Sequence, residues 1–140
     1  MADEVLLTIS TLQGDEEAPL ETRANARYYQ REGIHYLLFE ERLEGFASSF
    51  QSRLKIKKQH IELKRQGAAT IHMIFEEGKR HLTRYATPYG ELHLEICTRK
   101  VEVEEKEEGL FVMVEYTMET DGALLNEYQI RIAATKKASD

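Results

Sequence analysis

Apolar residues recur at every second position along most of the chain, which is the pattern of half-buried β-strands. Leu92, Leu94 and Ile96, for example, alternate with polar residues. The alternating segments lie at residues 5–10, 34–39, 53–57, 60–64, 91–96, 101–103, 110–116 and 127–132. Segment 34–39 is apolar on both faces, whereas most of the others predict one buried face and one face in water.

Short turn signals separate these segments. Asp121-Gly122 lies between two alternating runs and favours a type I′ hairpin turn, in which both central residues have positive φ. Thr87–Gly90 suits a type I turn with proline at its second position. The phase of the alternation changes near Arg99 and Lys100, which predicts a β-bulge there because one extra residue reverses the facing of every later side chain.

The sequence therefore predicts an all-β fold, a single antiparallel up-and-down β-barrel of about ten strands that forms one domain over residues 1–140. No long helical stripe competes, and the chain has only two prolines and no low-complexity linker. Closing the sheet into a barrel removes its exposed edges. A two-sheet sandwich is the alternative architecture.

Composition narrows the class of protein. The chain has 140 residues, of which 41% are hydrophobic and 31% charged, a balance typical of a globular domain. Its net charge of −6 argues against a nucleic-acid partner. Cys97 is the single cysteine, so no internal disulfide is possible. The acidic N-terminus lacks the features of a signal peptide, and no apolar run reaches the roughly 18 residues of a membrane span. We therefore expect a cytoplasmic protein with no membrane partner.

Several short stretches resemble a known family in their order and spacing. They are Tyr36-Leu37-Leu38-Phe39-Glu40-Glu41, Arg65-Gln66-Gly67, Met73-Ile74-Phe75 and Tyr85-Ala86-Thr87-Pro88-Tyr89-Gly90, followed by Thr98 and Tyr116. Together they resemble the YwiB-like family of small bacterial proteins. The resemblance implies a lipocalin-like (calycin) β-barrel, a bacterial origin and a cytoplasmic setting, and it implies no activity. Phe39 departs from the tyrosine usual in the family, which removes one hydroxyl group.

Familiar motifs for cofactors and catalysis are missing from the sequence. It has no GxxxxGK[ST], GxGxxG, GxSxG or HExxH stretch, so we predict no cofactor and no catalytic residue. A two-residue turn at Glu77-Gly78 would place His72 and His81 on one face of a hairpin. No third ligand is evident, so we predict no metal site.

Glu41 and Arg65 are the most informative charged residues. Arg65 has the parity of Ile61 and Leu63 along its strand, and Glu41 has that of Phe39. Both side chains are thus expected to point inward, where isolated charges are costly and tend to pair. Such a pair is either a polar anchor for a ligand or an ion pair that stabilises the closed barrel. A third alternative is that one of them lies beyond its strand end and meets water.

Large side chains could fill the barrel or line a small cavity in it, since barrels of this size can do either. The candidate ligand-binding residues are Tyr36, Phe39, Glu41, Arg65, Met73, Tyr85, Tyr116 and Tyr128. Non-catalytic binding of a small apolar or amphipathic molecule by a monomer or homodimer is the leading functional hypothesis. The alternatives are an enzyme that uses interior Glu41 and Arg65 for acid–base chemistry, and a protein-interaction module. Of these hypotheses, we favour an enzyme less than a binding protein without catalytic activity.

Charged runs on two hairpins are expected to face solvent. Residues 53–65 are rich in lysine and arginine, and residues 102–108 are rich in glutamate. Solvated faces that discourage edge pairing explain both runs. The basic hairpin has no interleaved aromatic residues on its own two strands, which argues against stacking with nucleic-acid bases.

Overall fold

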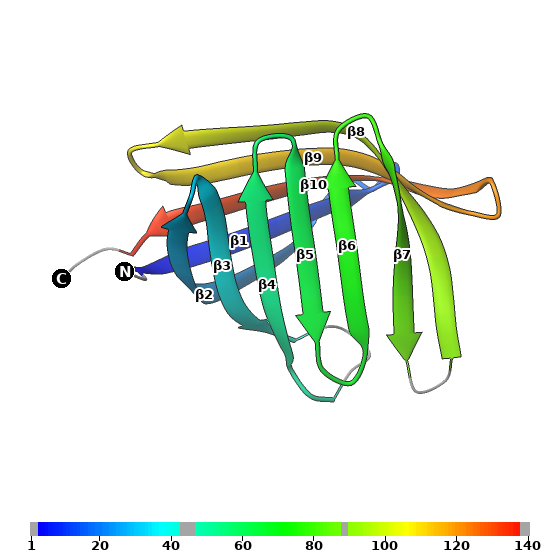
Figure 1. The fold of residues 1–140 in the computed structure, drawn as a ribbon, viewed down its shortest axis with the longest axis horizontal. Helices are drawn as coiled ribbons and strands as arrows, with labels where there is room; N and C mark the ends of the chain where they lie inside the picture. The colour runs from blue at the N-terminus through cyan, green and yellow to red at the C-terminus, as the bar shows by residue number, and fades with distance from the viewer. Residues whose placement is uncertain (1–2, 43–46, 88–89, 138–140) are drawn as a thin grey trace.

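The computed structural model describes residues 3–42, 47–87 and 90–137, and ten antiparallel strands close into a barrel (Figure 1). The strands are β1 (Asp3–Gln13), β2 (Leu20–Arg31), β3 (Ile34–Glu41), β4 (Phe50–Lys57), β5 (His60–Gln66), β6 (Thr70–Glu76), β7 (Arg80–Thr87), β8 (Gly90–Lys106), β9 (Gly109–Thr120) and β10 (Ala123–Lys136). Each strand pairs with its neighbours in sequence, and β1 pairs with both β2 and β10. The predicted all-β, up-and-down barrel of ten strands is confirmed.

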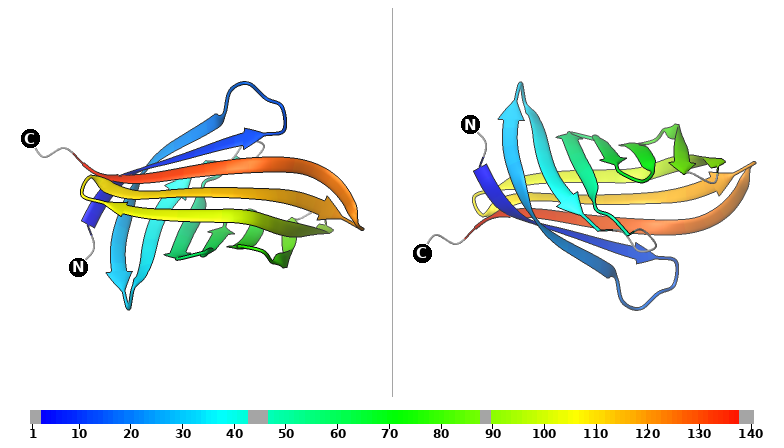
Figure 2. Two further views of the ribbon diagram at one scale, coloured as in Figure 1. Left: turned by 90° about the horizontal axis from the view of Figure 1, so that it is seen from above. Right: turned by 90° about the horizontal axis from the view of Figure 1, so that it is seen from below.

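The barrel is flattened into two layers of strands. Figure 1 shows β3 to β7 running side by side in front, while the long strands β8, β9 and β10 pass behind them at a steep angle. Figure 2 shows β4, β5 and β6 on one side of the band that β8, β9 and β10 form. Side chains at alternate positions of both layers point inward and make the core. Its most enclosed members include Leu37, Ile56 and Ile96, each without measurable solvent exposure.

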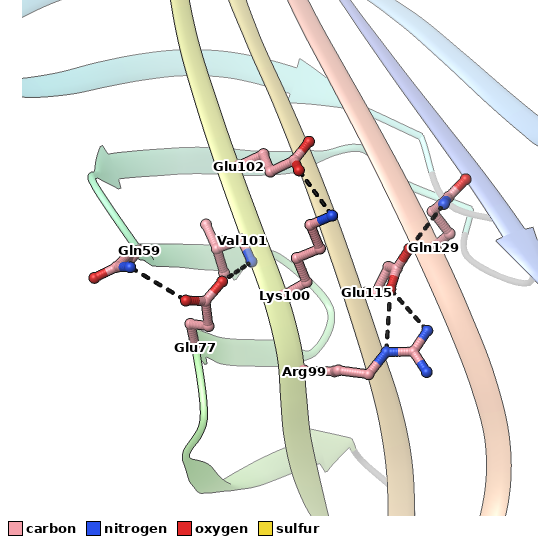
Figure 3. A network of polar contacts seen from close by, with 8 residues as sticks. All are labelled: Gln59, Glu77, Arg99, Lys100, Val101, Glu102, Glu115 and Gln129. Atoms are coloured by element: carbon pink, nitrogen blue, oxygen red, sulfur yellow. Dashed lines mark hydrogen bonds and ion pairs between the residues drawn. The ribbon is translucent and has the colours of Figure 1, made fainter.

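A bulge lets β8 bend across the barrel. The register between β8 and β9 shifts by one residue between Thr98 and Lys100, where the change in alternation predicted a bulge. Beyond the bulge, the backbone N–H of Val101 donates to a carboxylate oxygen of Glu77 at 2.9 Å (Figure 3). Glu77 lies in the turn between β6 and β7 and also accepts a hydrogen bond from Gln59 at 3.1 Å. This carboxylate therefore ties two turns to the bent strand.

The tight turns follow the local chemistry. Asp121 and Gly122 have φ values of 49° and 78°, which confirms the predicted type I′ turn between β9 and β10. The predicted turn through Pro88 lies outside the described residues. Gly90, at its far end, has a φ of 137°.

Thr70 of β6 pairs with Ala86 of β7 and Ile71 with Tyr85, a register one residue away from the one that a two-residue turn at Glu77-Gly78 would give, so that turn prediction is wrong. Within the described ranges, we find no helix of the length and hydropathy that a membrane span requires.

Candidate functional site

A cavity of about 240 Å³ lies inside the barrel. Its walls are mostly apolar and include Ile9, Leu54 and Val114, and its charged groups come from Glu41 and Arg65. Pockets for drug-sized ligands span about 300–1,000 Å³. A cavity just below that range suits a small molecule.

Glu41 and Arg65 meet at this cavity. Glu41 ends β3 and its side chain is only 1% exposed, while Arg65 on β5 is 18% exposed. The Nε of Arg65 donates to Oε1 of Glu41 at 2.6 Å, and the hydroxyl of Ser52 donates to the same oxygen at 2.6 Å. Ser52 lies on β4, directly between the two, because it pairs with Arg65 in the β4–β5 ladder. The predicted inward pair is confirmed.

The ion pair leaves part of the Arg65 guanidinium free. Its contacts to Glu41 use Nε and, at 3.5 Å, Nη2. Among the described residues, Nη1 has no hydrogen-bond partner. A guanidinium has five N–H donors, so Arg65 can bind an acceptor on a ligand while it stays paired with Glu41.

Tyr116 adds a phenol hydroxyl to the cavity wall. Its ring stacks on Tyr128 at a centroid distance of 5.0 Å and packs against Phe75 at 4.7 Å. Burial raises the pKa of the Tyr116 hydroxyl well above its usual value of 10.0, with a smaller contribution from Tyr128. The phenol is therefore protonated at neutral pH. Beside it, the buried hydroxyl of Thr98 has no hydrogen-bond partner within the described part of the chain.

Of the eight side chains expected at the site, the cavity brings four together. Glu41, Arg65, Met73 and Tyr116 line it. Phe39 is buried in the adjacent core.

The other three expected side chains fall elsewhere. Tyr128 packs on Tyr116 at the edge of the core. Tyr36 is on the outer face, stacked on Tyr29 at 4.7 Å, so its placement inside the barrel is wrong. It has the opposite parity to the inward residues Leu37 and Phe39 of β3. The side chain of Tyr85 lies outside what the structure describes.

Sequence reasoning missed a second polar cluster, at the other end of β3. The hydroxyl of Tyr28 and Nδ1 of His35 are 2.7 Å apart, and Nε2 of His35 is 2.5 Å from Oε1 of Glu105. His35 is buried, whereas the Glu105 side chain is 64% exposed. The three residues border an open groove of about 520 Å³. In the sequence, the parity that His35 shares with Leu37 indicates an inward side chain. No sequence pattern links His35 to Glu105, which lies 70 residues later in the chain.

Histidines elsewhere pair with different carboxylates. His72 lies 3.5 Å from Glu62, while His81 lies 3.0 Å from Glu76. In the described ranges, no three His, Cys, Asp or Glu side chains converge as metal ligands would.

Comparisons with known proteins agree with the fold. The chain matches a family described as a domain of unknown function (DUF1934) over residues 6–132. It also resembles the crystal structure of the ywiB protein from Bacillus subtilis, with a TM-score of 0.84 and 19% identity over 98% of this chain and 94% of that chain. No curated protein matches. The resemblance to the YwiB-like family is confirmed, and at this identity the structural match shows a common fold.

Proposed function

Because the chain belongs to the DUF1934 family, whose function is unknown, we propose a function from the cavity itself: the barrel binds a small, partly apolar molecule without transforming it. The observation that carries this proposal is the free edge of the Arg65 guanidinium at a mostly apolar cavity. A polar head bound there would place its apolar part against Ile9 and Val114.

The charges at the site define the head group. Glu41 neutralises Arg65, so the site favours a neutral or singly negative head that accepts hydrogen bonds, such as a carboxylate or a carbonyl. The protonated hydroxyl of Tyr116 offers a further donor on the same wall.

An acid–base role for the pair is the second candidate, and the geometry favours it less. Oε1 of Glu41 already accepts two hydrogen bonds of 2.6 Å, one from Ser52 and one from Arg65. With Oε1 held by Ser52 and Arg65, the pair is better placed to anchor a ligand than to act on one. We also place the protein in the cytoplasm, since its lone Cys97 suits a reducing compartment.

Calorimetric titration with octanoate, and with octanamide as the neutral probe, tests the proposal. Arg65→Met is expected to weaken binding about 10-fold or more, since a hydrogen bond to a charged group contributes about 1.5–3 kcal/mol. Arg53→Met, on the outer face of the adjacent β4, is the matched control and should bind like the wild type. Binding that is equal in all three proteins, or no binding of either probe at millimolar concentration, would contradict the proposal.

A further inference from the structure

The outer surface of β2 to β5 carries positive charge that the net charge of the chain conceals. Its outward side chains contain seven lysines and arginines against three glutamates. We call this surface the cationic face; its charged members are Arg23, Arg27, Arg31, Arg53, Lys55, Lys57, Lys64, Glu21, Glu40 and Glu62.

Strand register aligns three of the cations in one row. Arg27 pairs with Leu38, Leu38 with Arg53, and Arg53 with Lys64. Neighbouring strands lie about 4.8 Å apart, so the row spans about 15 Å across four strands. The same three cations border a shallow groove of about 540 Å³, together with three amide side chains and the single carboxylate of Glu40.

A pair of tyrosines lies in the next row of the cationic face. Tyr29 and Tyr36 stack with their ring centroids 4.7 Å apart and their planes 10° apart. Tyr36 pairs with Lys55, whose Nζ lies 6.0 Å from the ring centroid. The basic hairpin has no aromatic residue of its own, but the barrel places these two rings from β2 and β3 directly beside it.

Most of the cations are not neutralised by neighbours. Arg53 lies 3.5 Å from Glu62, and Arg23 lies 2.8 Å from Glu21. Arg27, Arg31, Lys57 and Lys64 have no ion-pair partner among the described residues.

Negative charge is concentrated in the opposite layer. Residues 90–120, which form β8, β9 and their hairpin, contain nine glutamates and three lysines or arginines. This segment alone accounts for the net charge of −6. Its strands lie behind the cationic face in the view of Figure 1. The negative net charge of the chain therefore does not disfavour a nucleic-acid partner at the cationic face.

We propose that the cationic face binds single-stranded nucleic acid, with phosphates on the row of Arg27, Arg53 and Lys64 and a base stacked on the Tyr29–Tyr36 pair. A pleated sheet face with basic and aromatic side chains side by side provides both contacts that single strands need. A second copy would have to place its acidic layer on this face. That contact is head-to-tail and would not close into a dimer. An anionic membrane would use the same cations, but the two stacked tyrosine rings present a flat platform that suits a base better than a lipid surface.

Fluorescence anisotropy of the full chain with a labelled 12-nucleotide oligouridine, and with oligodeoxythymidine of the same length, tests the proposal. We expect dissociation constants on the order of 10 µM at 50 mM salt. Single strands show a slope of about −0.7 per phosphate contact in a plot of log affinity against log salt, so three contacts predict a slope of about −2.

Two variants separate the contacts. The triple variant Arg27→Gln, Arg53→Gln, Lys64→Gln is expected to weaken binding at least 10-fold and to flatten the salt slope. Tyr29→Leu with Tyr36→Leu is expected to weaken binding about 10-fold and to leave the slope unchanged, because base stacking contributes about 1–3 kcal/mol per base.

The control variant Arg80→Gln, Arg84→Gln, Arg99→Gln removes the same charge from exposed side chains outside the cationic face and should bind like the wild type. Circular dichroism checks that every variant is folded. Three outcomes would overturn the proposal: no binding of either oligonucleotide, an equal loss in the control, or binding to phosphatidylserine vesicles but not to the oligonucleotides. The octanoate titration is independent, since none of these substitutions touches the cavity.

Discussion

The Glu41 side chain is almost fully buried and accepts two short hydrogen bonds. Both facts determine how much the removal of either partner lowers the free energy of unfolding. Removing one member of a buried ion pair leaves an uncompensated charge and typically costs about 3–5 kcal/mol, whereas replacing both members with apolar residues is often close to neutral. Arg65 is partly exposed, so its unpaired charge can reach water. The two single losses should therefore be unequal.

A double-mutant cycle tests this coupling. We expect Glu41→Leu to destabilise by about 2 kcal/mol and Arg65→Leu by about 3 kcal/mol, with the double variant less than additive by about 1–3 kcal/mol. Urea unfolding of the three variants and the wild type measures each free energy. Additive losses would show that the two side chains do not depend on one another.

Tyr116 makes the stability of the barrel sensitive to alkali. Burial raises the pKa of its phenol above 10.0 in the folded state, so the folded chain favours the protonated form. This contribution is complete below pH 10 and is lost as the pH rises towards the folded pKa. We expect Tyr116→Phe to lose less stability than the wild type between pH 9 and 11, measured by thermal unfolding.

Burial also raises the pKa of Tyr28 and Tyr128, so Tyr116→Phe should remove only part of the alkaline loss. Absorbance at 295 nm should show one tyrosine that ionises only on unfolding. An identical alkaline loss in the wild type and the variant would contradict the assignment of this effect to Tyr116.

At the scale of elements, the hairpins depend on residues that tolerate positive φ. Gly122 has a φ of 78°, and no atom lies within 4 Å of the position that a Cβ would occupy. Its replacement by valine therefore costs backbone strain without a clash. We expect Gly122→Val to destabilise by about 1–3 kcal/mol, and Gly90→Val to act in the same direction at its φ of 137°. Ala123→Val, one position into β10, is the control for thermal melts and should have little effect.

The bulge in β8 depends on Glu77. Its carboxylate accepts a hydrogen bond from the backbone N–H of Val101 at 2.9 Å. Among the amino acids, only glutamate combines a negative charge with a side chain of this length. We expect Glu77→Ala to destabilise by about 1–2 kcal/mol, because a backbone donor loses a charged partner. Glu107→Ala at the tip of the β8–β9 hairpin is the control, and equal losses in both variants would contradict this role.

The alternation of apolar and polar residues predicted the features that depend on neighbouring positions in the chain. The phase of alternation located the bulge at Arg99, and parity placed Glu41 and Arg65 on inward faces. Parity is ambiguous in β3, where both faces are apolar, so Tyr36 was placed on the wrong side. The contacts of Glu105 with His35 and of Glu77 with Val101 join strands that are distant in sequence. They depend on how the barrel closes, which a pattern of alternation does not encode.

At the scale of the whole molecule, the two ends of β3 mark two ends of the barrel that differ in structure: one holds a hydrogen-bonded cluster and the other holds the cavity. His35 and Glu41 lie six positions apart along the strand, or about 20 Å. At the His35 end, a hydrogen-bonded chain joins Tyr28 on β2 to Glu105 on β8, which lies on the far side of the barrel. At the Glu41 end lies the cavity. The cavity and the linkage between the two layers are thus separated along one strand.

This arrangement predicts that the cavity can be reduced without loss of the fold. Val114 is buried and lines the cavity, so Val114→Phe would project a ring into about 240 Å³ of space. We expect a change in stability within about 1–2 kcal/mol in either direction, since cavity filling stabilises and overpacking destabilises by similar amounts. Octanoate affinity should fall at least 10-fold. Met113→Phe places the same ring one position away on the outer face of β9 and should leave octanoate binding unchanged. If Val114→Phe folds and binds octanoate as the wild type does, the ligand does not occupy the barrel.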